Sequence, residues 1–195
     1  MLDTDDHTVD IEIGRPPKGS DWALFAVFLP ILTVIIDQWT KFAATKFFKV
    51  PMNICETTPN PGFDVDMFWV VDLALVCNFG ISWGLLQGDS SFKRWGLTAF
   101  AFAMCIVLLY VFRTSRDNLT RASLGLVIGG AVGNGIDRFL FGAVTDFIDF
   151  GDIGFHWVFN IADSAITVGV IGLIIASLRM DRLEKNLKLK SEQGL

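Results

Sequence analysis

The stretch from Gly129 to Ala165 holds the main candidates for chemistry in this 195-residue chain. It sits between two apolar runs and carries acids, one arginine and two carboxamides: Asp137, Arg138, Asp146, Asp149, Asp152, Asp163, Asn134 and Asn160. Ionisable groups set against membrane-length apolar segments cost roughly 2.5–3.5 kcal/mol each at a helix centre, so they are functional candidates. No His or Cys stands beside these acids at metal-ligand spacing, which argues against a zinc site. The pattern therefore indicates acid–base chemistry without a metal or another cofactor.

Asp163 is the most informative of these acids, because it follows Asn160 by three residues where the last apolar run begins. Asn is a common helix N-cap, and a first-turn carboxylate is stabilised by roughly 0.3–1 kcal/mol, so helix capping alone would explain the pair. The acids of the preceding loop favour a second interpretation, in which a neighbouring carboxyl group shares a proton with Asp163. The ionised member would take a proton from water, and the protonated member would hydrogen-bond the scissile carbonyl, as in aspartic proteases. On physical grounds four partners stay open: Asp137, Asp146, Asp149 and Asp152.

The composition indicates what surrounds these acids. The chain is 52% hydrophobic and only 19% charged, which predicts a single-domain membrane protein. The net charge of −5 argues against nucleic acid as a partner.

We interpret four apolar runs as membrane-spanning helices: Trp22 to Phe48, Trp95 to Phe112, a third that begins near Ala122 and runs toward Gly135, and Ile161 to Leu178. The third run contains small residues at a spacing of four, which lets helix backbones approach closely. We therefore expect an all-α membrane protein with four transmembrane helices. The membrane domain should span residues 22–180, with a polar tail at 1–21 and a charged tail at 181–195.

The segment from Val50 to Gly88 differs from these runs, because prolines and glycines interrupt it and a β-branched, aromatic run follows at Phe68 to Val76. This pattern predicts one or two short strands, forming a small β-sheet on the extracytoplasmic membrane surface at about residues 50–88. A re-entrant helix is the alternative. A disulfide between Cys55 and Cys77 is possible on this side of the membrane. Cys105 lies in an apolar run, and we interpret it as a small hydrophobic residue.

Basic residues predict the orientation of the chain. They follow the second run and the fourth run: Arg113, Arg116, Arg121, Arg179, Arg182, Lys185, Lys188 and Lys190. By the positive-inside rule both termini are then cytoplasmic, and the surface sheet and the acid-rich loop share the outer side. Asp37 and Lys41 are four residues apart on the first helix and should pair there. That pair either orients the helix or takes part in the chemistry.

Five separated motifs resemble the bacterial lipoprotein signal peptidases (signal peptidase II). They occur in the family's order: Asp37-Gln38-Trp39-Thr40-Lys41, Asn78-Phe79-Gly80, Gly129 to Arg138, Val144-Thr145-Asp146-Phe147, and Phe159-Asn160-Ile161-Ala162-Asp163-Ser164. The resemblance implies that Asp146 and Asp163 are the catalytic pair. It also implies that eight residues line the site: Asp37, Lys41, Asn78, Gly80, Asn134, Asp137, Arg138 and Asn160. For Asp137 and Arg138, adjacent in sequence, we favour a structural ion pair.

The resemblance further implies an intramembrane aspartic endopeptidase of the bacterial cytoplasmic membrane. It would remove the signal peptide from prolipoproteins, cutting before a diacylglyceryl-modified cysteine, in contact with membrane lipids and open to inhibition by globomycin. Two other classes compete with this reading: a small proton or ion pathway protein with an Asp relay, and a lipid-binding scaffold. A relay predicts acids spread through the membrane depth, whereas these acids gather at one surface.

Overall fold

In the computed structural model, residues 21–58, 61–66, 71–80 and 91–193 are described. Within these ranges four helices are long and apolar enough to cross a membrane. They are α1 (Asp21–Phe47), α3 (Ser91–Thr114), α4 (Asn118–Phe141) and α5 (Ile161–Glu192). The four predicted spans are confirmed. Many large apolar side chains on them face outward, such as Ile106 at 69% exposure, as expected for helices surrounded by lipid.

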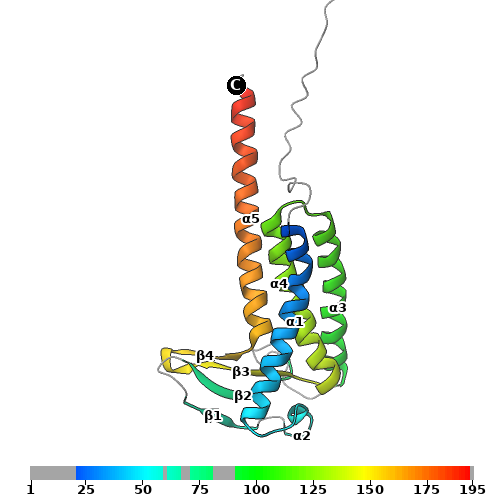
Figure 1. The fold of residues 1–195 in the computed structure, drawn as a ribbon, viewed down its shortest axis with the longest axis vertical. Helices are drawn as coiled ribbons and strands as arrows, with labels where there is room; N and C mark the ends of the chain where they lie inside the picture. Colours follow the sequence, from blue (N-terminus) through cyan, green and yellow to red (C-terminus); the bar gives the residue numbers. More distant parts are fainter. Residues whose placement is uncertain (1–20, 59–60, 67–70, 81–90, 194–195) are drawn as a thin grey trace, which may run out of the picture.

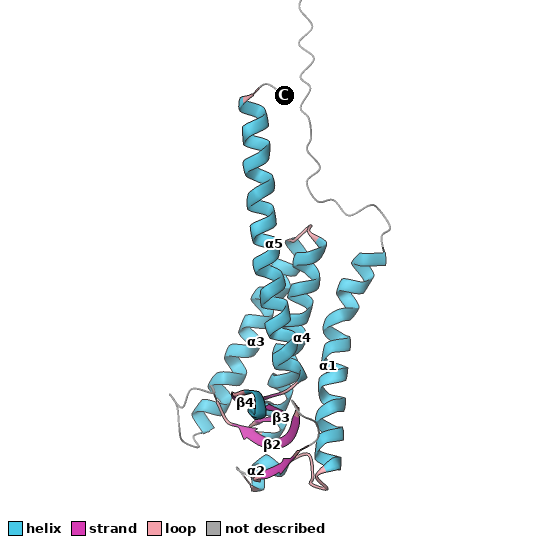
Figure 2. Ribbon diagram, turned by 90° about the vertical axis from the view of Figure 1, so that its left-hand side faces the viewer, coloured by secondary structure: helices cyan, strands magenta, loops and turns pink. Residues whose placement is uncertain are grey.

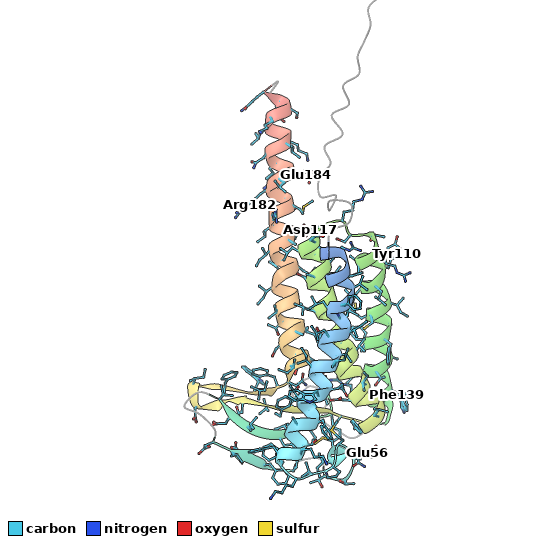
Figure 3. The ribbon with its side chains drawn as sticks, viewed as in Figure 1. Glu56, Tyr110, Asp117, Phe139, Arg182 and Glu184 are labelled. Carbon is cyan, nitrogen blue, oxygen red and sulfur yellow. A yellow bond between two sulfur atoms is a disulfide. The ribbon has the colours of Figure 1, made fainter. Side chains whose placement is uncertain are left out.

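The helices form a bundle with the small sheet at one end (Figure 1). Figure 2, turned by 90°, shows the same separation of helices and strands. The connection between α3 and α4 lies at the other end, and α5 extends past the bundle there. In Figure 3, Asp117, Arg182 and Glu184 mark that end and Glu56 the sheet end. The charged tail predicted after residue 180 thus continues α5 as helix as far as Glu192.

Helix α4 is the centre of the bundle, since it packs against α1, α3 and α5. Its glycines allow this, as predicted from their spacing. A Cβ at Gly129 would lie 2.7 Å from Thr33 Cβ of α1, and a Cβ at Gly130 would collide with Ala162 O of α5. Both helix backbones therefore approach α4 more closely than any larger residue would permit.

The sheet has four antiparallel strands in the order β1-β2-β3-β4. Its strands are β1 (Phe63–Val65), β2 (Asp72–Asn78), β3 (Val144–Phe150) and β4 (Phe155–Phe159). The expectation of strands between residues 50 and 88 is confirmed by β1 and β2. Residues 59–60, 67–70 and 81–88 of that segment, and the tail before residue 21, lie outside the described residues.

The structure corrects two expectations about where elements lie along the chain. The acid-rich segment after the third span is not only loop, because it supplies β3 and β4 to the same sheet. Asp137 and Arg138 belong to the last turns of α4, which continues well beyond Gly135. Gly142 ends that helix with φ +81°, a left-handed conformation that favours glycine, and β3 begins two residues later.

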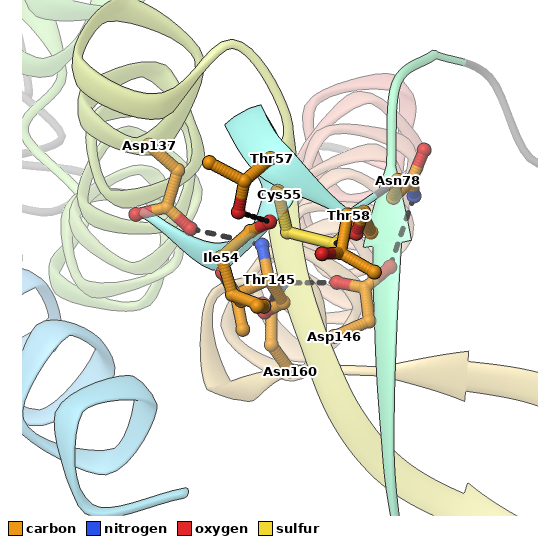
Figure 4. Close-up of a disulfide and its surroundings, with 10 residues drawn as sticks. Ile54, Cys55, Thr57, Thr58, Asn78, Asp137, Thr145, Asp146 and Asn160 are labelled. Atoms are coloured by element: carbon orange, nitrogen blue, oxygen red, sulfur yellow. Dashed lines mark hydrogen bonds between the residues drawn. A yellow bond between two sulfur atoms is a disulfide. The ribbon is translucent and has the colours of Figure 1, made fainter. Parts of the chain in front are cut away.

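A small apolar core joins α2 (Ile54–Thr57) to the sheet. Its buried members are Ile54, Cys55, Leu75, Cys77 and Ala143, with Phe48, Val50 and Phe79 packed against them. Cys55 and Cys77 form a disulfide with a Cα–Cα distance of 5.5 Å (Figure 4). The sequence did not decide whether Cys55 and Cys77 are bonded, and the structure shows that they are. The bond fixes Cys77, the residue directly before Asn78. Cys105 is a free, buried thiol.

Removing this disulfide should destabilise the protein. A cross-link with a sequence separation of 22 residues stabilises a fold by about 3 kcal/mol, chiefly by restricting the unfolded chain. We expect the Cys55→Ser/Cys77→Ser variant, and wild-type protein with reductant, to unfold at lower temperature in thermal denaturation. The Cys105→Ala variant should remain as sensitive to reductant as the wild type. A wild-type melting curve that reductant leaves unchanged would contradict this expectation.

Candidate active site

Asp146 lies on β3 and is buried, with 2% of its surface exposed. Its strand position opposes Val76 on β2, and Asn78 stands two residues further along β2, on the same face. Asn78 Nδ2 donates a hydrogen bond to Asp146 Oδ2 at 3.0 Å. Asn160 Nδ2 donates one to Asp146 Oδ1 at 2.6 Å (Figure 4). Both carboxyl oxygens are therefore held by carboxamides from different elements.

Asn78 should contribute to turnover through this contact. Its amide orientation is set by Gly80, whose backbone N–H donates to Asn78 Oδ1 at 3.1 Å and leaves Nδ2 to face Asp146. Asn78→Ala should lower turnover by up to roughly tenfold, since a typical hydrogen bond contributes about 0.5–1.5 kcal/mol. The steady-state rate of the purified variant checks this. Asn53→Ala, on an exposed turn at the same end of the molecule, is the control, and equal rates for both would remove Asn78 from the site.

Asp163 stands in the first turn of α5 and is half-buried. Asn160 Oδ1 accepts a hydrogen bond from Asp163 N at 2.9 Å, and Asp163 Oδ2 accepts one from Asn160 N at 3.3 Å. This reciprocal capping box confirms the capping role considered from the sequence. The other carboxyl oxygen, Asp163 Oδ1, accepts a hydrogen bond from Asn134 Nδ2 at 2.8 Å. Asp163 can therefore cap the helix and face the candidate site at the same time.

The two acids are linked through Asn134 and Asn160. Asn160 Nδ2 donates to Asp146 Oδ1 and also, at 3.2 Å, to Asn134 Oδ1, while Asn134 Nδ2 donates to Asp163 Oδ1. Both amides are buried, and each amide oxygen faces donor groups, which settles its orientation. Of the four acids that the sequence left open as partners of Asp163, the structure brings Asp146 into this chain of hydrogen bonds.

Burial and the negative charge of Asp163 raise the pKa of Asp146 to about 7. Hydrogen bonds from Asn78 and Asn160 and the positive charge of Lys41 act in the opposite direction, but they do not offset the loss of solvation. Asp146 is thus set to hold a proton near neutral pH, beside a second carboxyl group that is less buried.

A second set of charges lies deeper. Lys41 Nζ is 2.8 Å from Asp37 Oδ2 and 2.9 Å from Asp137 Oδ2, and at most 1% of each side chain is exposed. The predicted Asp37–Lys41 pair is therefore confirmed, but it lies inside the protein. Gln38 also belongs to this set, because its Nε2 donates to Asp137 Oδ1 at 2.8 Å. We had assigned no role to Gln38, although it stands between two predicted site residues in one motif.

We expected Asp137 to form an ion pair with Arg138, but its partner in the structure is Lys41. Neighbours in a helical sequence point in different directions, and the carboxylate of Asp137 turns inward to Lys41. Arg138 interacts electrostatically with Asp146 and Asp163 more strongly than with Asp137. Its Nη1 also donates to Asn134 O at 3.5 Å, so Arg138 belongs beside the two acids.

A pocket of about 460 Å³ opens beside Asp163, between β4 and the first turns of α5. Its lining combines polar groups with an apolar wall: Asn78, Trp157, Val158, Phe159, Asp163, Ser164, Thr167 and Val168. A smaller apolar pocket of about 280 Å³ between α1, α4 and α5 shares Ser164 and Val168 with it. Trp157, Ser164 and Thr167 had no predicted role. Ser164 and Thr167 stand one and four residues after Asp163 on α5, so helical spacing could have found them, whereas Trp157 reaches the pocket from β4.

The other two acids of the segment lie elsewhere. Asp149 is half-buried on β3 and accepts a hydrogen bond from Gly151 N at 2.8 Å, and Asp152 is exposed in the short turn that follows. Among the described residues no group of three or more His, Cys, Asp or Glu could hold a metal ion. Asp146 and Asp163, linked through Asn160 and Asn134 beside a largely apolar pocket, are arranged so that proton transfer could involve both carboxyl groups.

Comparison with known proteins gives a consistent result. The family model for signal peptidase (SPase) II matches residues 29–179. The chain is similar to a lipoprotein signal peptidase of Methylobacterium radiotolerans, with 40% identity over 77% of this chain and 84% of the relative. It is 37% identical to one from Burkholderia vietnamiensis, over 79% of this chain and 87% of the relative.

Two solved structures of bacterial membrane enzymes, both obtained by the in meso method, share the fold. One has a TM-score of 0.63 and 32% identity, covering 80% of this chain and 88% of the other. The second has a TM-score of 0.62 and 32% identity, covering 80% of this chain and 93% of the other. The residues matched by the family model, 29–179, include both Asp146 and Asp163.

Proposed function

The chain belongs to the signal peptidase II family, and we propose that it is an intramembrane aspartic endopeptidase with Asp146 and Asp163 as its catalytic dyad. The observation that carries this proposal is the pair of carboxyl groups joined through two amides, one buried with a pKa near 7 and the other lining a pocket. Two acids that share one proton are the minimal machinery for hydrolysing a peptide bond without a metal.

In the proposed reaction, Asp163 is the ionised base and Asp146 the protonated acid. Asp163 is half-buried and borders the pocket, and its place in the first turn of α5 stabilises a negative charge. It takes a proton from a water molecule, whose oxygen attacks the scissile carbonyl carbon. Asp146 gives its proton to the carbonyl oxygen, which yields a neutral tetrahedral intermediate.

Breakdown of the intermediate returns the dyad to its starting state. Asp163 passes the proton it has gained to the leaving amide nitrogen as the C–N bond breaks. The new carboxyl group forms as its hydroxyl proton returns to Asp146. The dyad again holds one proton, and one water molecule has been consumed. Arg138, which interacts with both acids, limits the build-up of negative charge between them.

The substrates we propose are prolipoproteins with a diacylglyceryl-modified cysteine, cleaved directly before that cysteine. The pocket beside Asp163 suits an extended peptide, with Trp157 and Phe159 as apolar walls. The neighbouring pocket between α1, α4 and α5 is almost wholly apolar and opens among helices that face lipid. It would accept apolar parts of the substrate at membrane depth.

We also propose that both termini are cytoplasmic and that the dyad faces the outer side of the cytoplasmic membrane. Support comes from the basic residues that flank α3 and α4 and extend along α5, at the end away from the sheet (Figure 3). A lipidated cysteine held at the outer surface would then lie at the depth of the sheet.

Purified protein should cleave a diacylglyceryl-modified prolipoprotein and leave the unmodified precursor intact. Mass spectrometry of the products should place the cut directly before the modified cysteine. EDTA should leave the rate unchanged, because the proposed chemistry uses carboxyl groups alone, and globomycin should block it. Loss of activity with EDTA, restored by zinc, would contradict the dyad.

A further inference from the structure

Two buried acids of the membrane helices hold the peptide groups that precede the dyad. Asp137 Oδ2 on α4 accepts a hydrogen bond from Thr145 N at 3.2 Å (Figure 4). Asp37 Oδ1 on α1 accepts one from Ala162 N at 2.9 Å. Thr145 and Ala162 are the residues directly before the two dyad acids. Each dyad acid is therefore placed by a backbone contact to a different membrane helix.

Lys41 joins these two supports. Its ammonium group lies between Asp37 Oδ2 and Asp137 Oδ2 and donates a third hydrogen bond to Asn134 Oδ1 at 3.1 Å. An ammonium group has three N–H donors, so all of them are used inside the protein. Lys41 and Asp37 are 0% exposed and Asp137 is 1% exposed, so none of the three presents a surface to a substrate.

The contact with Asn134 adds a direct link to the dyad. Because an ammonium group only donates, it fixes the oxygen of the Asn134 amide on its own side. The Nδ2 group of Asn134 then faces Asp163 Oδ1 at 2.8 Å. Without Lys41 the oxygen of this amide keeps only the hydrogen bond from Asn160 Nδ2 at 3.2 Å, so the donor that faces Asp163 is held less firmly.

We propose that Asp37, Lys41 and Asp137 form a charged frame that sets the separation and orientation of Asp146 and Asp163, with Lys41 as the central positioning residue. This role rests on the proposed function of the dyad, and it differs from substrate binding. Replacing a buried ion triad by neutral residues is often neutral for stability, so this triad is better explained by the arrangement that it specifies. Gly133 is part of the same fit, since a Cβ there would lie 2.6 Å from Asp37 Oδ2.

Lys41→Met tests the frame through kinetics. We expect kcat to fall by about 100-fold, because displacing catalytic groups by about 1 Å has such an effect, while KM stays within about twofold. Lys46→Met is the control, since Lys46 is exposed on the same helix. An unchanged kcat in Lys41→Met, or a raised KM with normal kcat, would overturn the proposal.

The pH profile separates positioning from general damage to the fold. Groups from every neighbouring element face Asp146: Lys41 of α1, Asn78 of β2, Arg138 of α4, and Asn160 and Asp163 at the start of α5. The charge of Lys41 lowers the pKa of Asp146, so its removal should raise that pKa and move the alkaline limb of kcat to higher pH. A partly unfolded preparation would lose amplitude without this shift.

A neutral triple variant, Asp37→Asn/Lys41→Met/Asp137→Asn, covers the case in which Lys41→Met does not fold. It removes all three buried charges, so no carboxylate is left without its cation, and we expect it to fold. It should still turn over about 100-fold more slowly than wild type. Wild-type turnover in this variant would overturn the frame, whatever Lys41→Met does.

Failure of the frame and failure of the dyad give different results. If the dyad is wrong, Asp146→Asn or Asp163→Asn stays active. If only the frame is wrong, those variants are inactive while the triple variant and Lys41→Met cleave at the wild-type rate.

Discussion

Asp146→Asn and Asp163→Asn should each lower cleavage of a lipidated prolipoprotein by roughly 10²- to 10⁴-fold, the contribution of a general acid or base. Asn has nearly the shape of Asp and still forms hydrogen bonds, but it can neither share a proton nor accept one from water. Expression and membrane insertion should stay normal. The rate of product formation by equal amounts of purified variant and wild type measures the effect.

The double variant Asp146→Asn/Asp163→Asn should be no slower than the slower single variant. Residues that act as one unit are strongly non-additive, because removing either already removes the function of both. Two losses that multiply would mean that the acids act independently, and the shared-proton mechanism would then be wrong.

The rate should also depend strongly on pH around neutrality. Burial and the charge of Asp163 raise the pKa of Asp146 to about 7, so the single-proton state of the dyad exists below that pH. As pH rises through about 7, Asp146 ionises and the acid is lost, so kcat should fall by about tenfold per unit at higher pH. A kcat profile measured from pH 5 to 9 checks this.

A variant of Asn78 tests whether ionisation of Asp146 causes the fall of kcat at alkaline pH. The hydrogen bond from Asn78 lowers the pKa of Asp146, so Asn78→Ala should raise it and move the alkaline limb to higher pH. The Asn53→Ala control should keep the wild-type limb. A rate that stays constant up to pH 9 in the wild type would contradict the assignment of Asp146 as the acid.

The sequence was sufficient to locate the spans, and it also supplied the two acids that we propose as the dyad. Long apolar runs predict membrane helices because lipid leaves few alternatives for the backbone. The motifs at Asp146 and Asp163 could be placed by resemblance, whereas physical reasoning alone left four partners for Asp163. The choice between them depends on the register of β3 against β2, which pairs Asp146 with Val76 and so brings it within reach of Asn78 two residues along. Spacing along the chain does not contain that register.

Contacts between distant segments were the part that the sequence could not predict. Asp137 was paired with its neighbour Arg138, but its carboxylate meets Lys41 of another helix because α1 packs closely on α4. Strand β4 was missed because its aromatic run is short and stands beside glycines and acids that resemble a loop. The role of Thr145 and Ala162 comes from backbone N–H groups, which every residue except proline carries.

The most direct test of the Asp146–Asp163 dyad compares the acids of one segment in a single assay. Lipidated prolipoprotein would be incubated with equal amounts of four purified variants: Asp146→Asn, Asp163→Asn, Asp149→Asn and Asp152→Asn. We expect the first two variants to be inactive and the last two to cleave near the wild-type rate, because Asp149 caps a turn and Asp152 is exposed. Activity in Asp146→Asn, together with its loss in Asp149→Asn or Asp152→Asn, would show that the dyad has been assigned to the wrong carboxyl group.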